Sequence, residues 1–350
     1  MNPRIKILAI FLSVATLVHV LLDDGAFISY IASFNFDYLK SNDTISEGTN
    51  SSLNGSILSS LNDTSFLQNC SETPPGLVGK IRVWMDGPSY HQLEKLYSTT
   101  VEKGGRSHPR DCIARHKVAI IVPYRDRDTQ LRIMLHNLHA LLTKQQLDYG
   151  IYVVEQIANQ TFNRAKLMNV GFDQAIKEYD WDCFVFHDVD LLPEDDRNLY
   201  SCPEQPRHMS VAVDKFNYKL PYAGIFGGIS ALTKEHFEKI NGFSNDYWGW
   251  GGEDDDLSTR VSTAGYKISR YPAEIARYKM IKHTHESSNK RNDCRFDIMR
   301  KTKRRWMQDG ISSLKYNVIE VEKNLLFTKI VVDLLYDESI VTLRKAVPSC

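Results

Sequence analysis

The sequence predicts an α/β fold with a mostly parallel central sheet flanked by helices. Short apolar runs rich in β-branched residues begin near residues 118, 151 and 183, as is typical of buried strands. The segments between these runs carry apolar residues at helical spacing. Strands that alternate with helices favour parallel pairing, because each helix carries the chain back to the same edge of the sheet.

Each element is indicated by its own pattern. Pro123 marks the point where the first strand runs into a loop. A hydrophobic fraction of 42% over 350 residues is enough for a proper core, and no internal repeat is present. The expected elements are a strand at 118–124, a helix at 131–142, a strand at 150–156, a helix at 164–179 and a strand at 183–190.

The N-terminus carries an apolar segment at residues 7–22, with basic residues before it and Asp23 and Asp24 after it. As a helix it spans about 24 Å at about 1.5 Å per residue, close to the thickness of a thin bilayer. A cleaved signal peptide is the alternative, but acids stand where its cleavage site is expected. We expect a retained signal-anchor, a cytoplasmic tail at 1–6 and a lumenal remainder.

The next region, residues 23–75, is rich in Ser, Asn and Gly and is expected to be a flexible glycosylated stem. A single lumenal catalytic domain is expected at 76–336, followed by a C-terminal tail at 337–350. Sequons occur at Asn42, Asn50, Asn54, Asn62, Asn69 and Asn159.

The charge and cysteine patterns exclude some function classes. The formal net charge is zero, so no global field favours nucleic acid or an acidic membrane surface. The six cysteines form no CxxC pair, which disfavours zinc and thioredoxin-like sites. An oxidising lumen favours disulfides, and six cysteines allow fifteen connectivities.

Polar residues follow two of the predicted strands, where open α/β sheets bind ligands. Arg125 and Arg127 in PYRDR could grip a diphosphate or a nucleobase, or could be ordinary surface arginines. Asp188 and Asp190 form a DxD motif, which indicates either a hard divalent cation with substrate phosphates or a turn cap.

Two further stretches add candidate ligands. The stretch YKMIKHTHE places Met280, His283 and His285 close together, although each is more commonly a structural residue. With a carboxylate, this mixed donor set suits Mn²⁺ better than Ca²⁺.

The stretch WGWGGEDDD, residues 248–256, combines two tryptophans, three glycines and four acids. Neither a solvated loop nor a core explains that combination, which predicts a polar, ring-shaped ligand.

These motifs together resemble the animal β-1,4-galactosyltransferase family. The segments VAIIVPYRDR, FNRAKLMNVGF, CFVFHDVDLLP, LPYAGIFGGISAL and GFSNDYWGWGGEDDD carry the resemblance, which extends from about Cys70 to Leu335. It implies a glycosyltransferase A fold in a single-pass type II protein of the Golgi membrane. It further implies an inverting enzyme that uses Mn²⁺ and a UDP-sugar to glycosylate O4 of a terminal β-linked N-acetylglucosamine on a glycoprotein or glycolipid.

The resemblance also implies roles for residues of this chain. Asp254 would be the base, with Glu253 and Asp255 orienting donor and acceptor hydroxyls, while Trp250 would cover the donor after its glycine-rich loop closes. The metal ligands would be Asp190, Met280 and His283. The nucleotide site would comprise Pro123, Tyr124, Arg125, Asp126, Arg127, Phe162, Asn163, Arg164, Val189, Asp190, Lys215, Trp250, His283 and His285. The sugar sites would comprise Tyr222, Ile225, Gly252, Glu253, Asp254, Asp255, Arg295, Phe296 and Met299.

The sequence departs from the family pattern at two positions. His285 replaces an arginine near the phosphates. Ile225 replaces the tyrosine of galactosyl-transferring members, which leaves apolar room for an acetamido group. We therefore expect UDP-N-acetylgalactosamine as donor, as in invertebrate N-acetylgalactosaminyltransferases of the family, with UDP-galactose as the alternative. The family pattern pairs Cys70 with Cys112 and Cys183 with Cys202, and leaves Cys294 and Cys350 without assigned partners.

Two other classes use similar residues. A metal-dependent lectin would need the aromatic and acidic residues but no nucleotide site, which PYRDR and FNR argue against. A metal-dependent phosphohydrolase usually needs a second metal set or a nucleophile, and the sequence shows neither.

Overall fold

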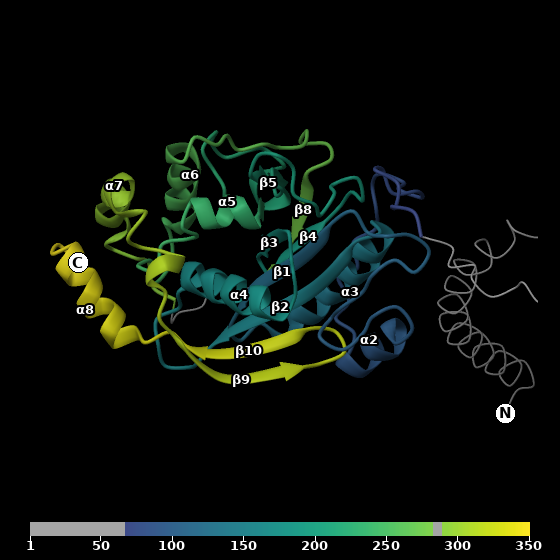
Figure 1. The fold of residues 1–350 in the computed structure, drawn as a ribbon, viewed down its shortest axis with the longest axis horizontal. Coiled ribbons are helices and arrows are strands. Elements are labelled where there is room, and N and C mark those ends of the chain that lie inside the picture. Colours follow the sequence, from purple (N-terminus) through teal and green to yellow (C-terminus); the bar gives the residue numbers. More distant parts are fainter. Residues whose placement is uncertain (1–66, 283–288) are drawn as a thin grey trace, which may run out of the picture. The chain divides into compact units, whose positions relative to one another are not determined.

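A seven-stranded mixed sheet forms the centre of the protein (Figure 1), in the strand order β5-β7-β3-β1-β2-β10-β9. The computed structural model describes residues 67–282 and 289–350, which belong to one compact unit, Ser65–Cys350. The four middle strands are parallel, as predicted, and antiparallel strands extend the sheet at both edges. The strands are β1 (Lys117–Tyr124), β2 (Asp148–Gln156), β3 (Cys183–His187), β5 (Arg207–His208), β7 (Ile229–Thr233), β9 (Asn317–Lys323) and β10 (Thr328–Asp333).

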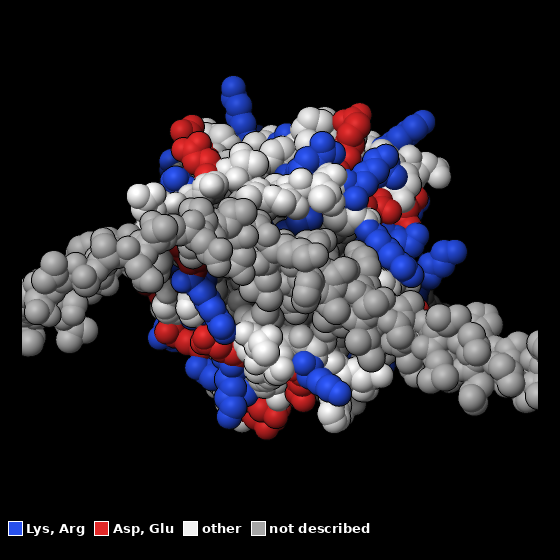
Figure 2. Space-filling model, turned by 90° about the vertical axis from the view of Figure 1, so that its right-hand side faces the viewer, with Lys and Arg blue, Asp and Glu red and all other residues white. Residues whose placement is uncertain are grey.

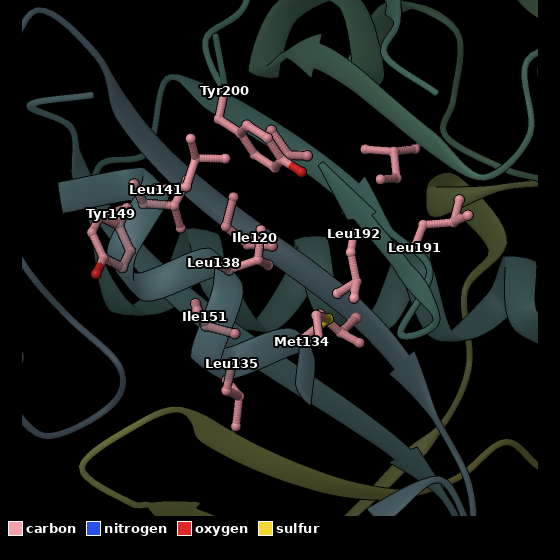
Figure 3. Packing of buried hydrophobic residues seen from close by; sticks show 14 of the residues in the cluster. Ile120, Met134, Leu135, Leu138, Leu141, Tyr149, Ile151, Leu191, Leu192 and Tyr200 are labelled. Atoms are coloured by element: carbon pink, nitrogen blue, oxygen red, sulfur yellow. The ribbon is translucent and has the colours of Figure 1, made fainter. Parts of the chain in front are cut away.

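Two long helices cover opposite faces of the sheet. Strand β1 is buried on both faces, so its side chains alternate between two cores. Ile120 packs with α3 residues such as Met134 and Leu138, as Figure 3 shows, whereas Ile121 packs with Met168 of α4 on the other face. The helices are α3 (Asp128–Lys144) and α4 (Arg164–Glu178), with the shorter α2 (Tyr90–Tyr97) and α5 (Lys234–Lys239).

The remaining elements build the region beyond the carboxyl ends of the parallel strands. A small second sheet has the order β4-β8-β6. Helix α6 packs against α7, and α8 follows the last strand. These elements are β4 (Leu191–Pro193), β6 (Ala212–Val213), β8 (Arg277–Met280), α6 (Glu253–Thr263), α7 (Arg295–Arg305), α8 (Tyr336–Ala346) and the short 3-10 helices η1 (Asp214–Phe216) and η2 (Ile311–Ser313).

The folded unit extends past both composition-based boundaries, 75 and 336. Asn69 pairs with Ile113 in a β-bridge, and the neighbouring Cys70 is buried. At the other end, Leu343 and Val347 belong to the core on the α4 side of the sheet. Both chain segments therefore contribute to the fold rather than only flanking it.

Three disulfides lie within the described residues. The predicted pairs Cys70–Cys112 and Cys183–Cys202 are confirmed. The third joins Cys294, just before α7, to Cys350 at the end of the chain. It ties the C-terminal segment to the helix that carries the predicted acceptor residues.

The anchor, most of the stem and the sequons at Asn42, Asn50, Asn54 and Asn62 lie outside the described residues. Asn69 and Asn159 are both exposed. Within 67–282 and 289–350, none of the helices is both long and apolar enough to span a bilayer. Figure 2 shows Lys and Arg interspersed with Asp and Glu on the described part of one face, in keeping with the balanced charge of the chain.

Candidate active site

Arg125 and Phe162, which the sequence predicts to bind the nucleotide, lie together at the carboxyl ends of β1 and β2. The Arg125 guanidinium lies 5.0 Å from the centroid of the Phe162 ring and donates a hydrogen bond of 2.6 Å to the Gln160 carbonyl. Such a cation–aromatic pair offers a flat surface and a positive charge to a nucleobase and its phosphates. The Phe162 carbonyl also accepts a hydrogen bond of 2.8 Å from Gly249, which attaches the tryptophan loop to this site.

Arg164 connects the DxD motif to the acids of α6. Its Nε donates to Asp188 Oδ1 at 2.6 Å, and its Nη1 lies 3.7 Å from Glu253 Oε1. Burial disfavours the charge of Arg164, but the Asp188 and Glu253 carboxylates outweigh this effect and raise its pKa. The Arg164 guanidinium therefore joins three segments that are distant in sequence: the start of α4, the DxD motif and the start of α6.

Two of the three predicted metal ligands lie side by side, Asp190 just before β4 and Met280 at the end of β8. Leu191 is the register partner of Met280, and the Ile281 amide donates to the Asp190 carbonyl at 2.8 Å. Asp190 and Met280 are therefore adjacent, whereas His283 and His285 lie outside the described residues. Without His283, no cluster of three His, Cys, Asp or Glu side chains in the described chain could hold a metal. The sequence did not single out Asp214, whose Oδ1 accepts from the Met280 amide at 2.9 Å and fixes that strand.

Glu253 and Asp254 at the start of α6 are partly buried, and their pKa values are raised. Burial, followed by the Asp254 carboxylate, raises the pKa of Glu253 to about 7, against the opposing effect of Arg164. Burial and then Asp255 raise the pKa of Asp254. Glu253 Oε2 is buried without a hydrogen-bond partner among the described residues. A buried acceptor without a partner is costly, and a hydroxyl group of a bound sugar would satisfy it.

Gly227 makes room for the Asp254 carboxylate. A Cβ atom at this position would lie 2.4 Å from Asp254 Oδ2, so any side chain would displace the acid.

The same segment contains Ile225, whose carbonyl accepts a hydrogen bond of 2.7 Å from Arg270. The Ile225 amide donates to the Tyr222 carbonyl at 3.3 Å, and the Tyr222 hydroxyl donates to Asp255 Oδ1 at 2.7 Å. Tyr222 and Gly227 thus touch the acid cluster, whereas the sugar contacts expected of Tyr222 and Ile225 stay predictions.

The glycine-rich loop presents Trp250 to solvent, with 57% of the residue exposed. Backbone hydrogen bonds join Trp250 to Lys290 at 2.9 Å and to Asn292 at 3.0 Å. Gly249 and Gly252 have φ angles of 89° and 98°, which only glycine adopts readily. A Cβ at Gly249 would also lie 2.5 Å from the Lys290 carbonyl oxygen. This conformation itself requires the glycines, and loop closure stays a prediction.

The predicted acceptor residues lie beside this loop at the start of α7. The Arg295 guanidinium lies 4.2 Å from the centroid of the Phe296 ring, and its side chain packs against Gly251 and Gly252. Phe296 is 54% exposed and Met299 is half-buried. An exposed aromatic ring next to the α6 acids is suited to pack against a sugar.

Other predicted nucleotide residues have structural roles or lie at the edge of the site. The Asn163 side chain is fully buried, where it caps α4 and donates to the Asn245 carbonyl at 2.8 Å. Its polar atoms are therefore used within the fold. Val189 packs against the core on the α3 side. Pro123 and Tyr124 end β1, Asp126 and Arg127 connect β1 to α3, and Lys215 lies in η1 after β6.

The fourth acid of α6, Asp256, points away from the site. It is 1% exposed and forms a 2.6 Å ion pair with Arg260, which is equally buried. Asp256 also accepts a hydrogen bond from Thr302 of α7, and Arg260 donates to the Asp309 carbonyl at 2.7 Å. This network fastens α6 to α7 and so positions the predicted base next to the predicted acceptor residues. The acidic run in the sequence did not indicate which of its members would be buried.

Comparisons with known proteins agree with this geometry. The N-terminal region of glycosyl transferase group 7 matches residues 70–203, and the N-terminal domain of galactosyltransferase matches residues 207–284. Beta-1,4-galactosyltransferase 2 of Cricetulus griseus is 51% identical over 266 residues, 76% of this chain and 72% of that protein. Beta-1,4-galactosyltransferase 1 of Homo sapiens is 50% identical over 268 residues, 77% of this chain and 67% of that protein.

Solved structures agree as well. The catalytic domain of Drosophila beta-1,4-galactosyltransferase 7 in complex with xylobiose has a TM-score of 0.53 and 30% identity, over 63% of this chain and 94% of that one. A mutant of the same protein in complex with manganese, UDP-Gal and xylobiose has a TM-score of 0.54 at the same identity and coverage. The predicted glycosyltransferase A fold is confirmed by this similarity. The chain therefore belongs to the β-1,4-galactosyltransferase family of UDP-sugar-dependent glycosyltransferases.

Proposed function

We propose that this enzyme transfers N-acetylgalactosamine from UDP-N-acetylgalactosamine to O4 of a terminal β-linked N-acetylglucosamine, with inversion at the anomeric carbon. The observation that carries the donor assignment is the isoleucine at position 225. Its segment lies against the acid cluster, because Gly227 abuts Asp254 and Tyr222 donates to Asp255. These contacts hold the backbone of position 225 between two residues that touch the acid cluster, and we infer that its side chain borders the space of the transferred sugar.

The chemistry of Ile225 favours the larger donor. Isoleucine offers no hydrogen bond and is shorter than the tyrosine expected in galactosyl-transferring members, so the acetamido group at C2 has apolar room. Arg270 holds the Ile225 carbonyl and therefore fixes the backbone from which this side chain projects. Discrimination by such steric and apolar contacts is commonly about 10- to 200-fold.

The acid cluster supports a single in-line displacement. The acceptor O4 forms a bond to the anomeric carbon while the bond from that carbon to the diphosphate oxygen breaks, and the O4 proton passes to an Asp254 carboxylate oxygen. A raised pKa makes Asp254 a stronger base than an ordinary aspartate. Glu253, with its partnerless Oε2, and Asp255, held by Tyr222, orient sugar hydroxyls.

The residues also fit a divalent metal. Asp190, just before β4, and Met280 at the end of β8 lie side by side and would hold Mn²⁺ together with His283. When bound, the ion would stabilise charge on the leaving diphosphate. The structure of the related Drosophila enzyme in complex with manganese and UDP-Gal supports this assignment.

Galactose transfer is the second candidate. The relatives that are about 50% identical are named beta-1,4-galactosyltransferases, and the Drosophila structure holds UDP-Gal. Their names do not bear on position 225 of this chain, so the donor has to be measured.

For location we propose the Golgi membrane with type II topology, which the apolar segment at 7–22 and the six sequons support.

Donor profiling tests the assignment. Wild-type enzyme should prefer UDP-N-acetylgalactosamine to UDP-galactose by about 10- to 200-fold in kcat/KM with free N-acetylglucosamine and Mn²⁺. Ile225→Tyr should shift the preference toward galactose, whereas the control Ile225→Leu should keep it. A wild-type preference for UDP-galactose, or an unchanged ratio in the tyrosine variant, would make the enzyme a galactosyltransferase.

A further inference from the structure

Helix α7 carries a concentration of positive charge that the balanced composition of the whole chain conceals. Residues 290–305 contain eight Lys or Arg and two Asp, although the full chain has 43 basic and 43 acidic residues. The proposed reaction uses only Arg295 of these cations. Figure 1 shows α7 beside α8 at the opposite end of the unit from α2.

Four of the eight cations of this stretch, Arg295 included, are engaged within the fold. Arg305 forms a 2.6 Å ion pair with Asp246, and Lys301 Nζ donates to the Ala346 carbonyl at 2.9 Å. Arg300 pairs with Asp297 one turn earlier. Lys303 and Arg304 are exposed and, like Lys290 and Arg291 before the helix, form no ion pair with any residue in the described ranges. No carboxylate of the described residues therefore compensates the charges of Lys303 and Arg304.

The helix period places these two cations in line with the acceptor site. Arg295, Ile298 and Thr302 are buried and define the inward face of α7. Phe296, Arg300 and Lys303 follow at spacings of four and three residues and define the outward face. At about 1.5 Å per residue, the free cations lie about 11 to 12 Å along the helix from Phe296.

We propose that Lys303 and Arg304 form an extended acceptor site for an acidic polypeptide that carries the acceptor glycan. This proposal rests on the proposed function, which places the terminal N-acetylglucosamine against Phe296. An extended peptide advances about 3.3 to 3.6 Å per residue, so the distance corresponds to three or four residues. Arginine binds carboxylates in a bidentate manner, and lysine adds a second positive charge.

The test compares two peptides that carry one β-linked N-acetylglucosamine on serine. One has aspartates three and four residues from that serine, and the other has asparagines. Wild-type enzyme should show a kcat/KM about 2- to 10-fold higher for the acidic peptide at low ionic strength. The preference should disappear at about 1 M salt, where the Debye length is about 3 Å.

The double variant Lys303→Gln/Arg304→Gln should lose this preference and retain full activity on free N-acetylglucosamine. A matched control, Lys95→Gln/Lys103→Gln, removes the same charge from exposed lysines elsewhere on the surface and should keep the preference. Equal use of both peptides by wild-type enzyme, or a preference that survives in the double variant, overturns the proposal. Loss of binding to anionic phospholipid vesicles in the double variant, with the peptide preference intact, would assign the cations to a membrane surface instead.

The two proposals can fail separately. If neither UDP-sugar is transferred to free N-acetylglucosamine, the proposed function is wrong whatever the peptides show. Fluorescence anisotropy of the labelled acidic and amide peptides then still tests the cations, because binding needs no transfer. Equal affinities of wild-type protein for both peptides in that measurement overturn the extended site.

Discussion

Asp254 and Asp256 are two residues apart on the same helix, yet they have opposite surroundings. Asp254 lies in the crevice against Gly227, and the neighbouring Glu253 keeps a buried oxygen without a partner in the described part of the chain. Asp256 is also buried, but it pairs with Arg260 and accepts from Thr302. Burial raises the pKa of both aspartates; Arg164 opposes the rise at Asp254 by charge alone, whereas Arg260 and Thr302 oppose it at Asp256 through direct hydrogen bonds as well.

We expect this difference to separate acids that serve a ligand from acids that serve the fold. A buried carboxylate whose hydrogen-bonding capacity is filled internally contributes to structure, and its removal leaves a buried partner uncompensated. A carboxylate with unfilled capacity is costly to the free protein and is explained by a bound group. Activity and stability should therefore respond in opposite ways to substitutions at the two kinds of acid.

The largest effect on activity is expected at the proposed metal site. Asp190→Ala should abolish Mn²⁺-dependent transfer, because it removes one of three proposed ligands. It should leave the midpoint of thermal unfolding nearly unchanged, because Asp190 is only half-buried. Near-normal turnover at saturating Mn²⁺ would show that Asp190 does not hold the metal.

The largest effect on stability is expected at Asp256. Asp256→Ala should lower the free energy of unfolding by about 3 to 5 kcal/mol, because it leaves Arg260 buried beside an empty position. Urea unfolding measures this change. A loss below about 1 kcal/mol, with activity strongly reduced, would place Asp256 among the acids that serve the ligand.

At Asp254 we expect the opposite outcome, a large loss of activity without a loss of stability. Asp254→Asn should lower kcat by at least about 10²-fold, since an amide cannot accept the O4 proton. The same variant should unfold at an equal or higher temperature, because it removes one of several neighbouring negative charges. An effect confined to KM would transfer the role of base to Glu253 or to another group.

The smallest effect is a pH dependence of stability that Glu253 introduces. Its pKa is about 7 in the folded protein against an ordinary value of 4.5, so the folded state binds more protons than the unfolded state between these values. Stability should therefore fall as pH rises from about 4.5 to 7, by at most about 3 kcal/mol. Unfolding curves of wild type and Glu253→Gln across this range measure the difference. The same pH dependence of stability in both proteins would show that folding does not raise the pKa of Glu253.

Local sequence patterns were sufficient for the middle of the fold and for bringing several candidate site residues together. Alternating strands and helices correctly predicted β1, α3, β2, α4 and β3, because a buried parallel strand and an amphipathic helix each have a recognisable period. The same patterns placed the polar loops at the strand ends, where Arg125 meets Phe162 and Arg164 meets Asp188.

Other features depend on contacts between distant segments, which no local period encodes. The run EDDD does not show that its last member is the buried one, because that depends on Arg260 and Thr302. The Cys294–Cys350 pair and the antiparallel edge strands likewise depend on how the chain end returns to the sheet. Sequence alone thus determined which residue types meet at the strand ends. Tertiary structure decided which carboxylates are neutralised there, because burial and partners, rather than residue type, set the energy of a charge.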